Sequence, residues 1–197
     1  MPCSADSVWG SRVSVSAVPG GKRVLVIGVT GSGKTTFGEN LGRALGIPCT
    51  DMDSLYWGPN WTPRAKEDFL NEVDRTTQEN QWILTGNYRA TRSLSWPRAT
   101  ILVWLDYPLH RVFGRLFLRT VKRSWNHELL WGVNKETFGK HLKLWSDDSL
   151  FYWLLKTYWR RKREIPSLLN LPEYRHLRVI RITNVYRAEG VIQALGH

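Results

Sequence analysis

The residues best suited to chemistry lie in one short stretch, Gly-Val-Thr-Gly-Ser-Gly-Lys-Thr at positions 28–35. This spacing fits a phosphate-binding loop, in which backbone N–H groups surround a phosphate, the lysine reaches the outer phosphates and the last hydroxyl faces Mg²⁺. The alternative is an ordinary glycine-rich turn, but an apolar run precedes the stretch and a helical pattern follows it, which favours the phosphate site. A nucleoside triphosphate is therefore predicted to contact Gly28, Thr30, Gly31, Ser32, Gly33, Lys34, Thr35 and Thr36.

Two carboxylates follow the next predicted strand, at residues 47–50. In an open α/β sheet the ligand crevice lies just outside the carboxyl ends of the strands, so Asp51 and Asp53 are placed for function. Residues two apart on a strand share a face, so both would point at one site if the extended geometry continues. The alternative is that Asp51 ends the strand in an Asx turn.

Three further loops carry candidate site residues. Tyr56 and Trp57 lie in a Gly/Pro-containing loop and would either wall a substrate pocket or cap the core from outside. Gly86, Asn87 and Arg89 follow a predicted strand at 81–85. Asp106 follows a further predicted strand at 100–105. Its carboxylate would either belong to the functional site or cap the next helix.

The elements that position these loops form an α/β pattern. Strands are predicted at 24–27, 47–50, 81–85, 100–105 and 177–182, separated by helices, which indicates a parallel sheet covered on both faces. Helices are expected from Thr62-Pro63 to about residue 79, from Leu109 onward, from an N-cap at Ser146 to about residue 163, and over 188–195. We interpret residues 1–21 as a tail and 22–197 as one domain.

Composition is that of a globular chain with a basic region. The chain has 197 residues, of which 42% are hydrophobic and 23% charged. Cys3 and Cys49 suggest neither a disulfide framework nor a metal knuckle. No stretch resembles an export signal or a membrane span. A cytoplasmic protein with no membrane partner is therefore expected. The net charge is +11, and residues 110–181 hold 16 Lys and Arg against 6 Asp and Glu. Such a region fits a site for several phosphates, a nucleic-acid footprint or a solvated basic face.

The order of parts resembles the small P-loop kinases related to adenylate, shikimate and gluconate kinases, and most closely the bacterial DNA topology modulation proteins, also called adenylate-kinase-like ATPases. The resemblance covers about residues 23–195. It rests on the loop at 28–35, Asp53-Ser54-Leu55-Tyr56-Trp57, Gly86-Asn87-Tyr88, Trp104-Leu105-Asp106 with Pro108, and Trp153 with Arg160, Arg161 and Arg163. Pieces at 128–131 and 134–136 also look like the lid insertion of actinobacterial relatives.

This resemblance implies a three-layer α/β/α P-loop fold, with a five-stranded parallel sheet and a helical lid inserted at about residues 110–165. It implies ATP and Mg²⁺ as cofactors, with Thr35 and Asp51 toward the metal. Lys34 and the lid arginines would act on the phosphates, and Asp53 would act on the acceptor hydroxyl. The lid arginines are Arg115, Arg119, Arg160 and Arg163, with Arg161 as a further candidate. Gly86 and Arg89 match a G-x-x-R acceptor loop, and the full set of acceptor-binding residues is Asp51, Asp53, Tyr56, Trp57, Gly86, Asn87 and Arg89.

One departure from the family concerns the metal. Relatives carry an acidic residue just before Gly86, where this chain has Thr85. A neutral hydroxyl cannot supply that charge, so Asp51, Asp53 or Asp106 would take over, or turnover would be weak.

The sequence therefore predicts an ATP-dependent kinase that phosphorylates a small acceptor, either a nucleoside monophosphate or a hydroxylated metabolite. The alternative is a nucleic-acid-binding protein that is regulated by ATP and has weak ATPase activity. Its basis is the basic region interleaved with tryptophans, whose rings could stack on bases. The favoured interpretation of those tryptophans is packing in the core of the lid helices. They are Trp125, Trp131, Trp145, Trp153 and Trp159.

Overall fold

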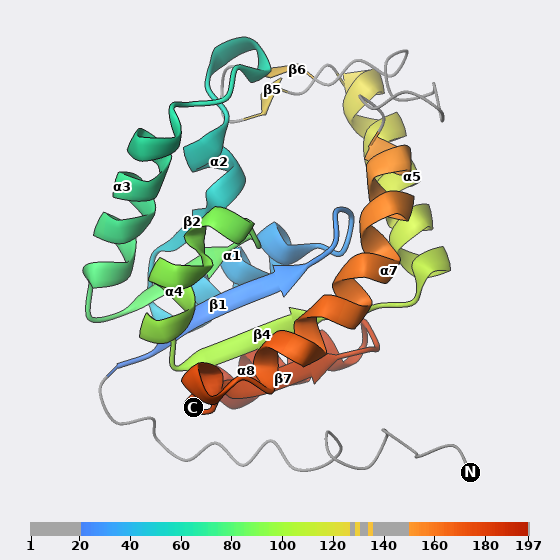
Figure 1. The fold of residues 1–197 in the computed structure, drawn as a ribbon. Helices are drawn as coiled ribbons and strands as arrows, with labels where there is room; N and C mark the ends of the chain where they lie inside the picture. Colours follow the sequence, from blue (N-terminus) through green and yellow to red (C-terminus); the bar gives the residue numbers. More distant parts are fainter. Residues whose placement is uncertain (1–20, 127–128, 131–133, 136–149, 197) are drawn as a thin grey trace.

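The computed structural model describes residues 21–126, 129–130, 134–135 and 150–196 (Figure 1). Apart from Gly21, the predicted tail at 1–21 lies outside these residues, as does the predicted cap at Ser146. The side chains of Trp125, Trp131 and Trp145 lie outside the described part as well.

A parallel five-stranded sheet forms the centre of the fold, as predicted. Its strands are β1 (Arg23–Gly28), β2 (Cys49–Asp51), β3 (Trp82–Thr85), β4 (Ile101–Leu105) and β7 (Arg178–Ile182), in the order β2-β3-β1-β4-β7. The central strand β1 pairs with β3 on one side and β4 on the other, and both pairings are parallel. All five strands therefore end at one edge, and the chain reverses its order of strands next to β1, where such sheets bind ligands.

Helices cover both faces of this sheet because side chains along a buried strand alternate between the two sides. Val24 and Val26 of β1 pack in one core with α1 (Lys34–Leu45), α5 (Leu109–Asn126) and α8 (Arg187–Gly196). Leu25 and Ile27 pack in the other core with α3 (Lys66–Gln78), α4 (Arg92–Arg98) and the end of α7 (Leu150–Leu169). The predicted three-layer α/β/α architecture is confirmed.

Two predicted helix boundaries are wrong. Helix α3 begins at Lys66, because Thr62 instead closes the 3₁₀ turn η1 (Pro59–Trp61) and Pro63 bridges to Trp57. Helix α7 runs past residue 163 to Leu169, with Pro166 inside it. Its last turns continue because Ile165 and Leu169 are buried against the sheet.

The segment between β4 and β7 stands over the carboxyl edge of the sheet. Helices α5 and α7 lie side by side, and a short antiparallel pair, β5 (Leu129–Leu130) and β6 (Asn134–Lys135), lies between them in sequence. Figure 1 shows β5 and β6 on the far side from α5, where β6 approaches η1. The segment thus reaches from one side of the strand ends to the other.

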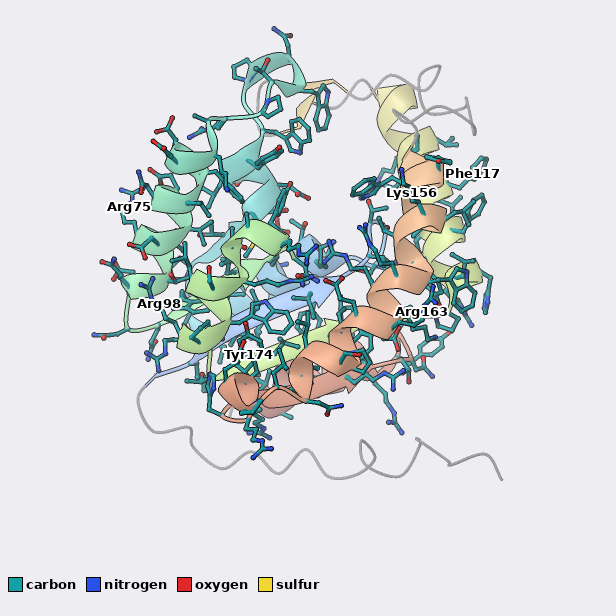
Figure 2. The ribbon with its side chains drawn as sticks, viewed as in Figure 1. Arg75, Arg98, Phe117, Lys156, Arg163 and Tyr174 are labelled. Atoms are coloured by element: carbon teal, nitrogen blue, oxygen red, sulfur yellow. The ribbon has the colours of Figure 1, made fainter. Side chains whose placement is uncertain are left out.

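The expectation that the lid tryptophans pack in a core is wrong for the two whose side chains are described. Trp153 is 48% exposed and Trp159 is 57% exposed. The buried side of α7 is formed instead by Leu154, Tyr158 and Ile165. Figure 2 shows the neighbouring helix α5 with Phe117 on its outer side, away from α2 and α3, where it is 43% exposed.

Candidate active site

The phosphate-binding loop follows β1 and leads directly into α1, as predicted. Gly31 and Gly33 have φ angles of +78° and +84°, in the region that favours glycine. Helix α5 also packs against the loop, since a Cβ on Gly31 would lie 3.0 Å from Cβ of Leu116 and one on Gly33 would lie 2.6 Å from Nη2 of Arg115. Arg115, a predicted lid arginine, is therefore held directly over the loop.

Lys34 is half-buried at the start of α1, and its Nζ donates to the carbonyl oxygen of Val29 within the loop at 3.2 Å. Burial lowers the pKa of Lys34, while the negative charges of Asp53 and Asp51 oppose that shift. The ammonium group is thus close enough to both carboxylates for their charges to act on it. The structure therefore brings together the predicted phosphate lysine and the two predicted strand-end aspartates.

Asp51 joins the end of β2 to the phosphate-binding loop. Its Oδ2 accepts a hydrogen bond from Oγ1 of Thr35 at 2.7 Å, and its Oδ1 accepts one from the backbone N–H of Asp53 at 3.0 Å. The second bond caps helix α2 (Met52–Tyr56), so the extended geometry stops at Asp51 and the predicted strand-like alternation of the two aspartates is wrong. Burial, followed by the charge of Asp53, raises the pKa of Asp51.

Asp53 lies in the first turn of α2, where its Oδ1 accepts a hydrogen bond from the hydroxyl of Tyr88 at 2.6 Å. Burial, followed by the charge of Asp53, raises the pKa of Tyr88, so this phenol stays a proton donor at neutral pH. Tyr88 was not among the predicted site residues. The available signal was its place in the loop directly after β3, beside Gly86 and Asn87.

Aromatic side chains surround the Asp53–Tyr88 pair. The ring of Tyr56 lies 4.9 Å from that of Tyr88 and 5.2 Å from that of Phe69, which is buried in the core. Trp57 packs edge-on against Tyr56 at 4.8 Å and against Trp61 at 5.8 Å. Tyr56 therefore extends the core toward the site, and Trp57 and Trp61 continue that aromatic wall outward.

The loop after β3 is held by close packing and by a buried arginine. Gly86 has a φ of +132°, and a Cβ there would lie 2.7 Å from Cβ of Met52. The predicted residue Asn87 is buried, and its Oδ1 accepts a hydrogen bond from Nε of Arg92 at 3.2 Å. Arg89, the predicted acceptor arginine, is exposed. The arginine that the fold turns inward is Arg92, which sequence reasoning missed because it lies three residues beyond the motif.

The lid arginines differ in where the helices place them. Arg119 and Arg161 are close enough to Lys34 for their charges to lower its pKa. Arg160 and Arg163, which were predicted to contact phosphates, are on the exposed side of α7, and Nε of Arg163 donates to the carbonyl of Trp159 at 3.4 Å. Within the predicted basic run, the charge of Arg161 acts on Lys34, and both Arg161 and Lys162 line a small hollow that includes Val29 of the loop.

One of the three carboxylates that could replace the acidic residue missing at position 85 is already held in an ion pair. Oδ2 of Asp106 accepts hydrogen bonds from Nε and Nη2 of Arg181 at 2.9 and 2.5 Å, and the guanidinium lies 4.8 Å from the centre of the Trp104 ring. Asp106 is therefore bound to β7, whereas Asp51 and Asp53 face Lys34. Thr85 itself is fully buried.

The donor set fits Mg²⁺. Hard oxygen ligands are what this ion prefers, and the hydroxyl of Thr35 and the carboxylate of Asp51 are already joined at 2.7 Å. Burial, followed by the charge of Asp53, raises the pKa of Asp51, and a divalent cation beside Asp51 would stabilise its charged form against both. Among the described residues no group of three or more His, Cys, Asp and Glu side chains forms a metal site. Mg²⁺ binds through one or two carboxylates together with water and substrate phosphates, and Thr35 and Asp51 suit that mode.

Solved structures of small kinases share this architecture. Shikimate kinase from Acinetobacter baumannii in complex with shikimate superposes with a TM-score of 0.52 at 19% identity, over 86% of this chain and 88% of its own. A gluconokinase from Sinorhizobium meliloti 1021 gives 0.51 at 17% identity, over 88% and 89% of the two chains. The chain therefore has the fold of the small P-loop kinases.

Two curated proteins are related in sequence. Mouse threonine synthase-like 1 is 28% identical over 157 residues, and chloroplastic shikimate kinase 1 of Arabidopsis thaliana is 25% identical over 132 residues. The matches cover 70% and 58% of this chain but only 21% and 43% of the lengths of those relatives. No family model matches the chain.

None of the described helices combines the length and apolar character needed to cross a membrane.

Proposed function

We propose that this protein is an ATP-dependent small-molecule kinase that transfers the γ-phosphoryl group of ATP to a hydroxyl or phosphate oxygen of an acceptor. The observation that carries the proposal is the 2.7 Å hydrogen bond between Thr35 and Asp51. It links the phosphate-binding loop to the aspartate pair at the end of β2, which supports a meeting there of the ATP side and the acceptor side of the site. Figure 2 shows side chains from α2, α4 and α7 reaching into the same region above the carboxyl ends of β1 and β4.

Each group has a role that its position supports. The loop amides and Lys34 hold the β- and γ-phosphates, while Arg115 and Arg119 neutralise charge that spreads over the transferred group. Thr35 and Asp51 would hold Mg²⁺, which would supply positive charge to stabilise the phosphates. In the transfer, the bond from γ-phosphorus to the bridging oxygen of ADP breaks and a bond to the acceptor oxygen forms. Asp53, oriented by Tyr88, receives the hydroxyl proton of the acceptor.

The test is release of ADP from MgATP, alone and with a panel of nucleoside monophosphates, shikimate, gluconate and other small hydroxylated metabolites. Purified wild-type protein and Lys34→Ala are compared at equal concentration, with Mg²⁺ omitted in a parallel series. Acceleration by one acceptor class that requires both Lys34 and Mg²⁺ supports the proposal. Unchanged ATP turnover in Lys34→Ala contradicts it.

The finer resemblance to DNA topology modulation proteins, and a cytoplasmic location, stay predictions of the sequence. Shikimate and gluconate enter the panel because proteins of this fold are named for acting on them. Nucleoside monophosphates enter it because of the adenylate-kinase-like order of motifs.

A second candidate function is ATP-regulated binding of nucleic acid, favoured by the exposed face of α7. Trp153 and Trp159 are exposed there, and Lys156, Arg160 and Arg163 lie on the same side of the helix. Exposed aromatic rings among basic side chains can stack on bases. Binding of a generic single-stranded oligonucleotide that weakens steeply between low and physiological salt would support this function. Lack of binding at low salt would exclude it.

A further inference from the structure

Two aromatic side chains share a helix face with the carboxylate proposed to act on the acceptor. Tyr56 and Trp57 follow Asp53 by three and four residues, so the three side chains lie on one face of α2 and its end. That face is turned toward the phosphate-binding loop. Burial lowers the pKa of Lys34, and the charge of Asp53 is the largest influence against this shift. The two rings therefore lie beside the place proposed for phosphoryl transfer.

The rings of α2 and the following turn differ in what they pack against. Tyr56 and Tyr88 pack against the core that contains Phe69. Trp57 lies farther out, with its ring centre 4.8 Å from that of Tyr56 and 5.8 Å from that of Trp61. Both tryptophans are half-buried, so part of each indole stays open. Core packing thus accounts for the position of Tyr56 but not for that of Trp57.

The turn after Trp57 has a strained backbone. Asn60 and Trp61 have φ angles of +56° and +58°, in the left-handed region that is unfavourable for a bulky side chain. The turn is held closed by a hydrogen bond of 2.8 Å from the N–H of Gly58 to the carbonyl oxygen of Thr62. Strain that the surrounding structure maintains in this way clusters at ligand-binding sites. The turn therefore fits a role in holding a ligand against its rings.

The positions of Asp53 and Trp57 set the size of such a ligand. Trp57 lies one helical turn beyond Asp53, a rise of about 5.4 Å. At the other end of the wall, β6 approaches η1, which includes Trp61. A ring against Trp57 would thus have Asp53 on one side and β6 on the other. A hydroxyl that reaches Asp53 must then be carried on an arm of about one helical turn in length.

We propose that the phosphoryl acceptor carries a planar aromatic ring, which stacks on Trp57 while a hydroxyl on an attached arm reaches Asp53. The proposal rests on the kinase function proposed above and names its acceptor class. The flat apolar face of an indole suits a planar ring. An open-chain polyol would lose water there without gaining hydrogen bonds. The ring can belong to a nucleobase, with its sugar as the arm, or to a carbocyclic aromatic alcohol.

The experiment measures binding of adenosine, cytidine, 2-phenylethanol and ribose, by calorimetry, to the full-length protein saturated with Mg²⁺ and a non-hydrolysable ATP analogue. The analogue fills the nucleotide site, so the probes report a second site. Trp57→Leu removes the flat ring and keeps apolar bulk, whereas Trp57→Phe keeps a ring. Trp159→Leu makes the matched change at a residue of α7 that is 57% exposed. Thermal unfolding of each variant verifies that it is folded.

We expect at least one ring-bearing probe to bind the wild-type complex about tenfold or more tightly than ribose. Trp57→Leu should weaken that binding about tenfold, Trp57→Phe should weaken it less, and Trp159→Leu should leave it unchanged. Tighter binding of a nucleoside assigns a nucleobase, and tighter binding of 2-phenylethanol assigns a carbocyclic ring.

Four results would overturn the proposal. The first two are binding of no ring-bearing probe and binding of ribose as tight as that of the ring-bearing probes. The third is equal binding to wild type and Trp57→Leu. The fourth is a loss of binding in Trp159→Leu with none in Trp57→Leu, which would assign ring stacking to the exposed face of α7. Failure of the kinase function itself is seen separately, as ATP turnover that does not depend on Lys34.

Discussion

Replacing Asp51 by Asn separates its two structural roles, because Asn keeps the shape of the side chain and removes only its charge. The Asn Oδ1 can still accept from the N–H of Asp53, and its NH₂ can donate to the hydroxyl of Thr35, so the cap of α2 and the contact with the loop survive. What is lost is the negative charge of a proposed Mg²⁺ ligand. Even changes to the partners of a metal ligand cost about 10- to 100-fold in metal affinity, so we expect at least that loss in Mg²⁺-dependent ATP binding.

The same variant should be at least as stable as wild type without ligand at neutral pH. Burial and Asp53 raise the pKa of Asp51, so the folded state holds its proton more tightly than the unfolded state does. The resulting cost to stability is absent below the unfolded pKa of about 4, appears as pH rises through it, and is complete above the folded pKa. Asp51→Asn removes this cost, so any gain in melting temperature at pH 7 should shrink toward pH 4.

The assay is thermal unfolding at pH 7 and pH 4, together with titration of an ATP analogue with and without Mg²⁺. A melting temperature lowered by several degrees at pH 7, with Mg²⁺-dependent nucleotide affinity unchanged, would refute the reasoning. Asp51 would then be only the cap that ends β2, the alternative that the sequence left open.

Three other substitutions test the surrounding framework. Asp106→Asn should lower the free energy of unfolding by about 2–3 kcal/mol, because it breaks a charged pair with Arg181 in which the carboxylate side chain is 5% exposed. A melting temperature within a degree of wild type would contradict the ion pair. Gly86→Ala should lower the free energy of unfolding in denaturant by about 1–3 kcal/mol. The new Cβ would meet Met52 at 2.7 Å, and the φ of +132° is unfavourable for alanine. An unchanged denaturation midpoint would contradict this packing. Tyr88→Phe keeps the ring contacts and removes one 2.6 Å hydrogen bond to Asp53, so the free energy of unfolding should fall by about 1–2 kcal/mol. Affinity for the ATP analogue should be unchanged. A fall in that affinity would place Tyr88 on the ATP side of the site.

Local signals in the sequence were sufficient for most of the fold. The spacing of glycines with Lys34 and Thr35 predicted the phosphate-binding loop, because each position there has its own backbone or side-chain requirement. Short apolar runs separated by helical patterns predicted the strands of the sheet. The signal was strongest for β1, β3 and β4, because a strand covered on both faces needs apolar residues throughout, whereas the edge strands β2 and β7 are partly exposed. Helix ends were less well determined, as at Pro63, where hydrogen bonds within the preceding turn take precedence over the favourable first-turn position of proline.

The composition of the site depended on tertiary structure. Asp51 and Thr35 are 16 residues apart in sequence, and Asp53 and Tyr88 are 35 apart, so only the pairing of β2 with β3 and the packing of α1 bring these hydroxyls to the carboxylates. The rotation of α7 about its axis decided that Arg161, and not Arg160 or Arg163, turns toward the loop. Adjacent basic residues look alike in sequence, and the burial of Leu154, Tyr158 and Ile165 on one side of the helix sets which of them faces the site. The sequence by itself determined the chemistry that this protein carries, and the packing of its helices on the sheet determined which of its charged side chains meet.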